Sequence, residues 1–156
     1  LHTTSYLNQH LRLARAYFSG FNPIADTPLA GLPPASIERE HRLYQASFLL
    51  RDYGFDIEEL PFAQDGNLPL TEDPKLLWAR QHLADAPVEI NCADRETLLR
   101  VPGIGVKSAD RILAARRQGT LCDLSHLRQL HIAVKRVAPF VLLDGKRPAH
   151  QLRLPL

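Results

Sequence analysis

The sequence predicts a mainly α-helical protein, with a helical N-terminal region that contains at most a short strand, followed by a compact domain of two helical hairpins. Three observations predict this fold class. Helix-capping residues precede apolar positions spaced three or four apart, prolines and glycines stand between these runs, and one pattern recurs 28 positions later. A chain of 156 residues can bury a core without disulfides or metal.

The N-terminal region is expected to be mostly helical. A short helix is predicted over 3–11 and is followed by a strand-like run over 13–21. A proline-rich loop comes next. Ser36 then caps a helix that is expected to reach Tyr53, where Gly54 ends it.

A further helix is predicted to begin at Asp73 and Pro74, because these residues suit the N-cap and the first helical position. This helix is expected to end near Ala84, and a short extended run leads on to the next segment. The predicted domains are a mostly helical region over 1–90, a hairpin domain over 91–146 and a tail over 147–156.

The hairpin domain begins with the segment that is most informative about function. Asn91 is a suitable N-cap for a first helix that reaches about Arg100, and a second helix is predicted from Val106 to Arg117. The sequence Pro-Gly-Ile-Gly at 102–105 separates them. We therefore predict a helix, a four-residue turn and a second helix.

The two glycines of this turn have a chemical use. Gly103 and Gly105 permit positive φ and carry no Cβ, so the backbone N–H groups can approach a phosphate oxygen closely. The second helix begins at the same point with its positive dipole end, and Lys107 adds a full charge. Ile104 is expected to point between the helices and lock the turn. The alternative is a helical hairpin in which the glycines serve the turn alone.

A degenerate copy of this pattern follows. When 99–107 is placed over 127–135, Leu, Arg, Ile, Val and Lys coincide, but His131 and Ala133 replace the glycines. The second hairpin therefore keeps its apolar plug and Lys135, and we expect it to lose close approach to phosphate. Its role would be structural, because two packed hairpins bury faces that one hairpin leaves open.

Charge is divided unevenly along the chain. Residues 1–90 hold 7 Lys/Arg and 12 Asp/Glu, a net charge of −5, whereas 91–156 hold 12 and 5, a net charge of +7. The C-terminal part is therefore suited to a polyanion. The alternative is that its basic residues only solvate a small helical domain.

Other classes of site find no support in the sequence. Cys92 and Cys122 are far apart, and His126 alone cannot complete a metal site with Cys122. Unpaired cysteines favour a reducing cytoplasm as the location. No apolar run is long enough to span a membrane, and the common hydrolase, phosphate-loop and zinc-protease motifs are absent. Whether the protein is an enzyme stays open.

The stretch 91–113, with Leu-Arg-Val-Pro-Gly-Ile-Gly-Val-Lys-Ser-Ala at its centre, closely resembles the helix-hairpin-helix DNA-binding motif. The degenerate copy makes 91–143 similar to a tandem helix-hairpin-helix domain, a class of domain that grips the sugar-phosphate backbone without reading sequence. The phosphate contacts that the resemblance implies are the amides of Gly103, Gly105 and Ser108 and the side chain of Lys107, while Arg111, Arg116 or Lys135 would reach flanking phosphates.

The same resemblance implies a monovalent cation, K⁺ or Na⁺, bound by backbone carbonyls of the first hairpin. These carbonyls would belong to Leu99, Val101 and Ile104.

The N-terminal half resembles a narrower family. Motifs at five places occur in the same order as in the C-terminal part of DNA modification/repair radical SAM proteins, which this half of the chain resembles. In that family a helix-hairpin-helix region follows the catalytic barrel. The motifs lie at 15–24, 27–29, 39–45, 50–55 and 68–75. The resemblance implies that 1–90 is a remnant and extension of that barrel. Since the chain starts at Leu1 and contains no Met, we expect a piece of a longer protein.

One departure from that family decides the expected chemistry. The three-cysteine cluster motif is absent, because the chain has only two cysteines. An iron–sulfur cluster and S-adenosylmethionine are therefore expected only in the larger parent, and no cofactor beyond the hairpin cation is expected in this chain.

The leading hypothesis is non-sequence-specific DNA binding, with the chain as the DNA-positioning part of a radical SAM repair protein. The expected partners are DNA and a further repair protein, and no membrane. The alternative is a protein–protein interaction domain that uses the paired hairpins.

Overall fold

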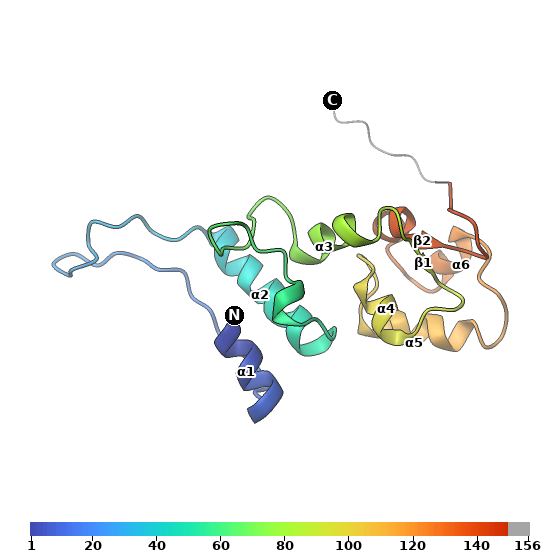
Figure 1. Cartoon of the computed structure of the whole chain (residues 1–156), viewed down its shortest axis with the longest axis horizontal. Coiled ribbons are helices and arrows are strands. Elements are labelled where there is room, and N and C mark those ends of the chain that lie inside the picture. Colours follow the sequence, from blue (N-terminus) through green and yellow to red (C-terminus); the bar gives the residue numbers. More distant parts are fainter. Residues whose placement is uncertain (150–156) are drawn as a thin grey trace. The chain divides into compact units, whose positions relative to one another are not determined.

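The computed structural model describes residues 1–149 and confirms the mainly α-helical fold class (Figure 1). The chain forms two compact units, unit 1 over Leu1–Pro74 and unit 2 over Lys75–Leu156. Residues 150–156, which make up most of the predicted tail, lie outside the described part of the chain.

Unit 1 contains two α-helices and a short 3-10 helix: α1 (His2–Leu11), α2 (Ile37–Asp52) and η1 (Ile57–Glu59). Both predicted helices are confirmed. The Ser36 side chain accepts a hydrogen bond from the backbone N–H of Arg39 at 3.2 Å, as expected of an N-cap. Gly54 follows the C-cap with φ of +68°, a conformation that favours glycine.

The strand-like run over 13–21 forms no strand, and side chains of α2 bind its backbone instead. The Tyr44 hydroxyl accepts from the N–H of Phe18 at 3.1 Å and donates to the carbonyl of the same residue at 3.0 Å. A Glu40 carboxylate oxygen accepts from the N–H of Gly20 at 2.8 Å. These side chains satisfy backbone groups that a neighbouring strand would otherwise pair.

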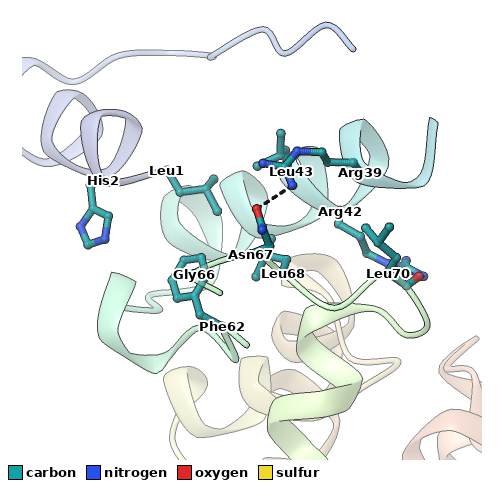
Figure 2. Close-up of a pocket in the computed structure, with 10 residues that line it drawn as sticks. All are labelled: Leu1, His2, Arg39, Arg42, Leu43, Phe62, Gly66, Asn67, Leu68 and Leu70. Carbon is teal, nitrogen blue, oxygen red and sulfur yellow. Dashed lines mark hydrogen bonds between the residues drawn. The ribbon is translucent and has the colours of Figure 1, made fainter. Parts of the chain in front are cut away.

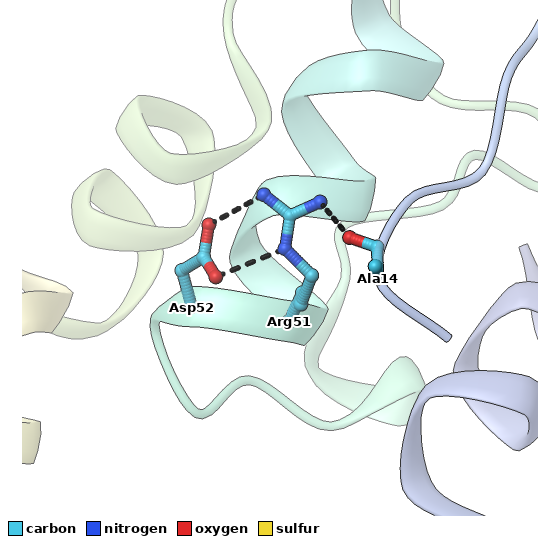
Figure 3. Close-up of polar contacts among 3 residues, drawn as sticks. All are labelled: Ala14, Arg51 and Asp52. Atoms are coloured by element: carbon cyan, nitrogen blue, oxygen red, sulfur yellow. Dashed lines mark hydrogen bonds and ion pairs between the residues drawn. The ribbon is translucent and has the colours of Figure 1, made fainter. Parts of the chain in front are cut away.

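Arg51 fixes the start of the same run (Figure 3). Its Nη1 donates to the Ala14 carbonyl at 2.9 Å, while Nε and Nη2 donate to the two carboxylate oxygens of Asp52 at 3.0 and 2.8 Å. The hydrogen bond to Asp52 raises the pKa of Arg51. The long loop between α1 and α2, pale blue in Figure 1, is therefore tied to α2 by polar contacts.

Unit 2 contains the two hairpins and a preceding helix. Its elements are α3 (Pro74–His82), β1 (Val88–Glu89), α4 (Arg95–Arg100), α5 (Val106–Ala115), α6 (Leu124–Gln129), α7 (Val134–Val137), the 3-10 helix η2 (Ala138–Phe140) and β2 (Val141–Leu142). Helices α4 and α5 form the first hairpin, and α6 and α7 form the second.

Two short parallel strands close unit 2. Val88 of β1 is paired with Val141 of β2, and the N–H of Ile90 donates to the Leu142 carbonyl at 3.1 Å. The chain that enters the first hairpin is therefore bonded to the chain that leaves the second. This pairing joins the ends of the two-hairpin segment.

The core of unit 2 is shared by both hairpins. Residues at equivalent places in the two hairpins are buried alike: Leu99 and Leu127 are 2% and 0% exposed, and Ile104 and Ile132 are 1% and 4% exposed. The repeat in the sequence therefore reflects a repeated packing role, and both isoleucines are apolar plugs.

Helix α3 packs with the hairpins, and the two compact units divide between Pro74 and Lys75. Trp78 is 8% exposed, its ring stacks on His82 at 4.4 Å, and the guanidinium of Arg100 in α4 lies 5.3 Å from the Trp78 ring centre. Ala79 is fully buried. These contacts group α3 with the segment that follows it.

The caps of the hairpin helices differ from expectation at one position. Asp94, and not Asn91, is the N-cap of α4, and its carboxylate accepts from the N–H of Thr97 at 2.7 Å. This hydrogen bond lowers the pKa of Asp94. Asn91 instead exchanges two hydrogen bonds with the backbone of Leu121, at 2.8 and 3.0 Å, and so joins the starts of the two hairpin segments.

Candidate nucleic-acid interface

The turn of the first hairpin is tightly defined. The N–H of Val101 donates to the Leu98 carbonyl and the N–H of Ile104 donates to the Val101 carbonyl, both at 3.1 Å. Pro102 is fully buried between these bonds. The backbone therefore reverses direction within a few residues, and Gly105 is the N-cap of α5.

The two glycines of the turn differ in conformation. Gly103 has φ of +88°, the left-handed region that glycine adopts without strain, whereas Gly105 has φ of −102° and ψ of 178°. Of the two glycines that permit positive φ, only Gly103 adopts it. Because Gly105 is extended, the following helix can start directly from it.

Gly103 also lies against the second hairpin. A Cβ at this position would be 3.0 Å from Arg136 Cβ and from Val137 Cγ2, and 3.3 Å from the Ala133 carbonyl oxygen. Real Cβ atoms are rarely so crowded. Gly103 is thus required by the packing of the two hairpins as well as by its φ.

Three of the predicted phosphate-binding residues lie together at the start of α5. No side chain caps this helix, and its first backbone bond runs from the N–H of Ala109 to the Gly105 carbonyl at 2.8 Å. Lys107 is exposed, and the Arg111 guanidinium donates to the Ser108 hydroxyl and to the Lys107 carbonyl at 3.2 Å each. Two cationic side chains and a hydroxyl therefore surround the positive end of the helix.

Two of the three predicted cation-binding carbonyls accept hydrogen bonds within the chain. The Ile104 carbonyl accepts a 2.6 Å hydrogen bond from Nζ of Lys75, and the Val101 carbonyl accepts from Ile104. A free ion on the Ile104 oxygen would lie beside this ammonium, and two unit charges 4 Å apart repel by about 4 kcal/mol at an effective dielectric constant of about 20. Because the Lys75 ammonium is bound to the Ile104 carbonyl, the three carbonyls of Leu99, Val101 and Ile104 do not fit a free cation.

The second hairpin has the same turn without glycine. His131, which occupies the place of Gly103, has φ of +54°, and Ala133, in the place of Gly105, has φ of −72°. The turn therefore keeps its left-handed residue but adds a side chain there. The exposed Lys135 lies in α7, so it stays a candidate for a flanking phosphate contact.

Arg116 has a structural role that its sequence position did not indicate. Its Nη1 donates to the carbonyls of Ile90, at 3.2 Å, and Ala93. The guanidinium thus binds the backbone between β1 and α4. Because both bonds hold the Arg116 side chain against the backbone, we do not expect it to reach a flanking phosphate.

We predict that Arg116→Ala lowers the free energy of unfolding by about 1.5–3 kcal/mol, because two carbonyls lose a charged donor. If the chain binds a DNA duplex, the same variant should leave the salt dependence of that binding unchanged. Urea denaturation followed by circular dichroism measures the first effect, and a DNA titration at several salt concentrations measures the second. A flatter salt dependence would mean that Arg116 also contacts phosphate.

A second basic surface lies on unit 2. A groove of about 510 Å³ is lined by four basic and four apolar residues: Arg80, Lys135, Arg136 and Arg147, with Leu76, Ala84, Pro139 and Phe140. These residues come from two stretches far apart in the sequence, 76–84 and 135–147. Sequence reasoning missed the groove for that reason, although the net charge of the region indicated a basic surface.

The cysteines do not form a metal site in the described part of the chain. Cys92 and Cys122 are both free and exposed, and the N–H of Cys122 donates to Nδ1 of His126 at 3.1 Å. Across residues 1–149, no group of three His, Cys, Asp or Glu side chains is arranged to hold a metal ion. Over the same residues, no helix has the length and apolar character needed to cross a membrane.

Unit 1 has a cavity of about 320 Å³ beside α2 (Figure 2). Its two arginines are bonded to the protein itself: Arg39 donates to the Asn67 side chain at 2.6 Å, and Arg42 donates to the Leu70 carbonyl at 2.9 Å. These bonds hold Asn67 and Leu70 against α2.

Comparisons with family models, with curated proteins and with solved structures find no match for this chain. The interpretation of the interface therefore depends on its residues and their geometry.

Proposed function

We propose that unit 2 binds DNA without sequence preference, through backbone phosphates at the first hairpin. The observation that supports this most directly is the cluster at the start of α5, where Lys107, Ser108 and Arg111 surround a helix end that no side chain caps. Unit 2 holds 14 Lys/Arg and 7 Asp/Glu, a net charge of +7, so its overall charge favours the same ligand.

The chemistry of this cluster fits a phosphate. The first N–H groups of an α-helix have no partners within the helix, and a phosphate oxygen is a strong acceptor that also carries the charge the helix end attracts. A phosphate is the same at every nucleotide. Contacts of this kind position a protein on nucleic acid and do not specify sequence.

We further propose that the chain is the DNA-positioning part of a larger cytoplasmic radical SAM protein that modifies or repairs DNA. The resemblance of 15–75 to that family supports this proposal, and the two exposed thiols agree with a reducing compartment. The genomic sequence upstream of Leu1 tests it. A three-cysteine cluster motif is expected there, and its absence would contradict the assignment.

The DNA-binding proposal predicts a specific effect of Lys107→Ala. If the hairpin neutralises on the order of 2–4 phosphates, log K should fall against log salt with a slope of about −0.9 for each phosphate. Removal of Lys107 should flatten that slope by about one unit and weaken binding equally on unrelated sequences. Fluorescence anisotropy with two unrelated duplexes, at four or more salt concentrations, measures both quantities.

Lys146→Ala is the charge-matched control, because this exposed lysine lies in the turn after β2 and outside both hairpins. It should leave the slope unchanged. Equal losses in the two variants would mean that general attraction, and not the hairpin, holds the DNA. A loss restricted to one duplex would indicate base readout, and a slope of zero for the native chain would contradict the proposal.

A protein-binding function is the second candidate, and one observation favours it on unit 1. Among residues 1–149, the exposed large apolar side chains all belong to this unit: Tyr6, Leu11, Tyr17, Ile24, Leu29, Leu32, Ile37, Phe48 and Leu70. Where such side chains lie together, they form surfaces that contact another protein or domain. This surface would become the leading explanation if DNA binding proved independent of salt.

A further inference from the structure

Lys75 extends from the first turn of α3 to the turn of the first hairpin. Its Nζ donates to the Ile104 carbonyl at 2.6 Å, a short distance typical of a hydrogen bond from a charged donor. The Lys75 side chain is half-buried, and the Ile104 side chain is 1% exposed. Both ends of the contact are therefore held in place by packing.

The bonded oxygen belongs to the same peptide unit as the N–H of Gly105. The described chain has no cis peptide bond, and in a trans peptide the C=O and N–H point in opposite directions. An ammonium that fixes the Ile104 oxygen therefore also fixes the direction of the Gly105 N–H. Gly105 is the N-cap of α5, beside the cluster formed by Lys107 and Ser108.

We propose that Lys75 is a tethered cation that takes the place of a free monovalent ion at this hairpin. Its ammonium holds the Ile104 carbonyl and so orients the Gly105 N–H for an anionic ligand. Because the charge is attached to the chain, its local concentration does not depend on the K⁺ or Na⁺ of the solution. The ion replacement is independent of DNA, and only the orientation toward phosphate rests on the proposed function.

The first experiment needs no DNA and no variant. The full chain is labelled with ¹⁵N, and the amide signal of Gly105 is followed during titration with KCl or NaCl against tetramethylammonium chloride at constant ionic strength. Tetramethylammonium is too large to bind carbonyl oxygens in a turn. The Gly105 signal should be the same in all three salts, and a saturable shift with K⁺ or Na⁺ would overturn the proposal, since a free ion would then bind the native hairpin.

The second experiment removes the charge with Lys75→Met, which keeps an unbranched side chain that is one atom shorter. In tetramethylammonium chloride the midpoint of thermal unfolding should fall by about 5 °C or more, and the Gly105 amide signal should move. Addition of K⁺ or Na⁺ should recover part of both changes, because the carbonyl is now open to an ion. Arg80→Met, which removes a charge from the same helix at the basic groove, should show no ion-specific recovery.

The outcomes separate this proposal from DNA binding. A Lys75→Met protein that loses stability without recovery by either ion would overturn the proposal, because the contact would then be only structural. If DNA binding is also present, Lys75→Met should weaken it about tenfold in tetramethylammonium chloride, with partial recovery in KCl. If the native chain binds no DNA, the ion-specific recovery of Lys75→Met is still expected. Its absence would contradict the proposal that Lys75 replaces a free ion and would say nothing about DNA binding.

Discussion

Gly103→Ala should destabilise unit 2 by about 2–5 kcal/mol. A left-handed backbone costs a residue with a Cβ about 1–2 kcal/mol, and overpacking in a close contact adds about 1–3 kcal/mol. Both costs apply, since φ is +88° and the new Cβ would lie 3.0 Å from atoms of Arg136 and Val137. At the equivalent place in the second hairpin, His131 has a φ of +54°, which a residue with a Cβ adopts at lower cost than the +88° of Gly103.

Urea denaturation followed by circular dichroism measures this loss. Gly119→Ala is the matched control, because a Cβ there would meet no atom within 4 Å and its φ lies outside the left-handed region. The control should change the free energy of unfolding by less than about 0.5 kcal/mol. A similar small change for Gly103→Ala would show that the two hairpins do not pack as closely as the structure has them.

Ile104→Ala should cost about 2–5 kcal/mol, the usual range for removal of a buried aliphatic side chain. Ile104 is 1% exposed and belongs to the core of unit 2, so its removal leaves a cavity. Ile132→Ala should have a similar effect, because the equivalent plug of the second hairpin is 4% exposed. Thermal and urea unfolding of both variants measure the loss.

Ile37→Ala is the control for this pair, because Ile37 is 84% exposed although it belongs to the same residue type. It should change the unfolding free energy by less than about 0.5 kcal/mol. If Ile104→Ala proved as mild as this control, the isoleucine would not be the plug of the turn. The structural role of the repeated Ile would then have to be abandoned.

The sequence by itself determined most of the local structure of this protein. Ser36 and Gly54 correctly delimited α2, and the turn over 102–105 was correctly located between two helices. These predictions succeeded because caps and turns depend on neighbouring residues, whose side chains bind backbone groups a few positions away. The repeat also predicted the two buried plugs, since residues at equivalent positions fill equivalent spaces.

Only the tertiary structure decided which distant residues meet. The Lys75 contact with Ile104, the Arg116 contacts with the 90–93 backbone and the crowding of Gly103 against α7 all join positions more than twenty residues apart. No local pattern encodes such pairs, because they depend on how the helices pack. For the same reason the sequence did not show that α3 contacts the first hairpin, since the contact between Trp78 of α3 and Arg100 of α4 is a property of the folded chain.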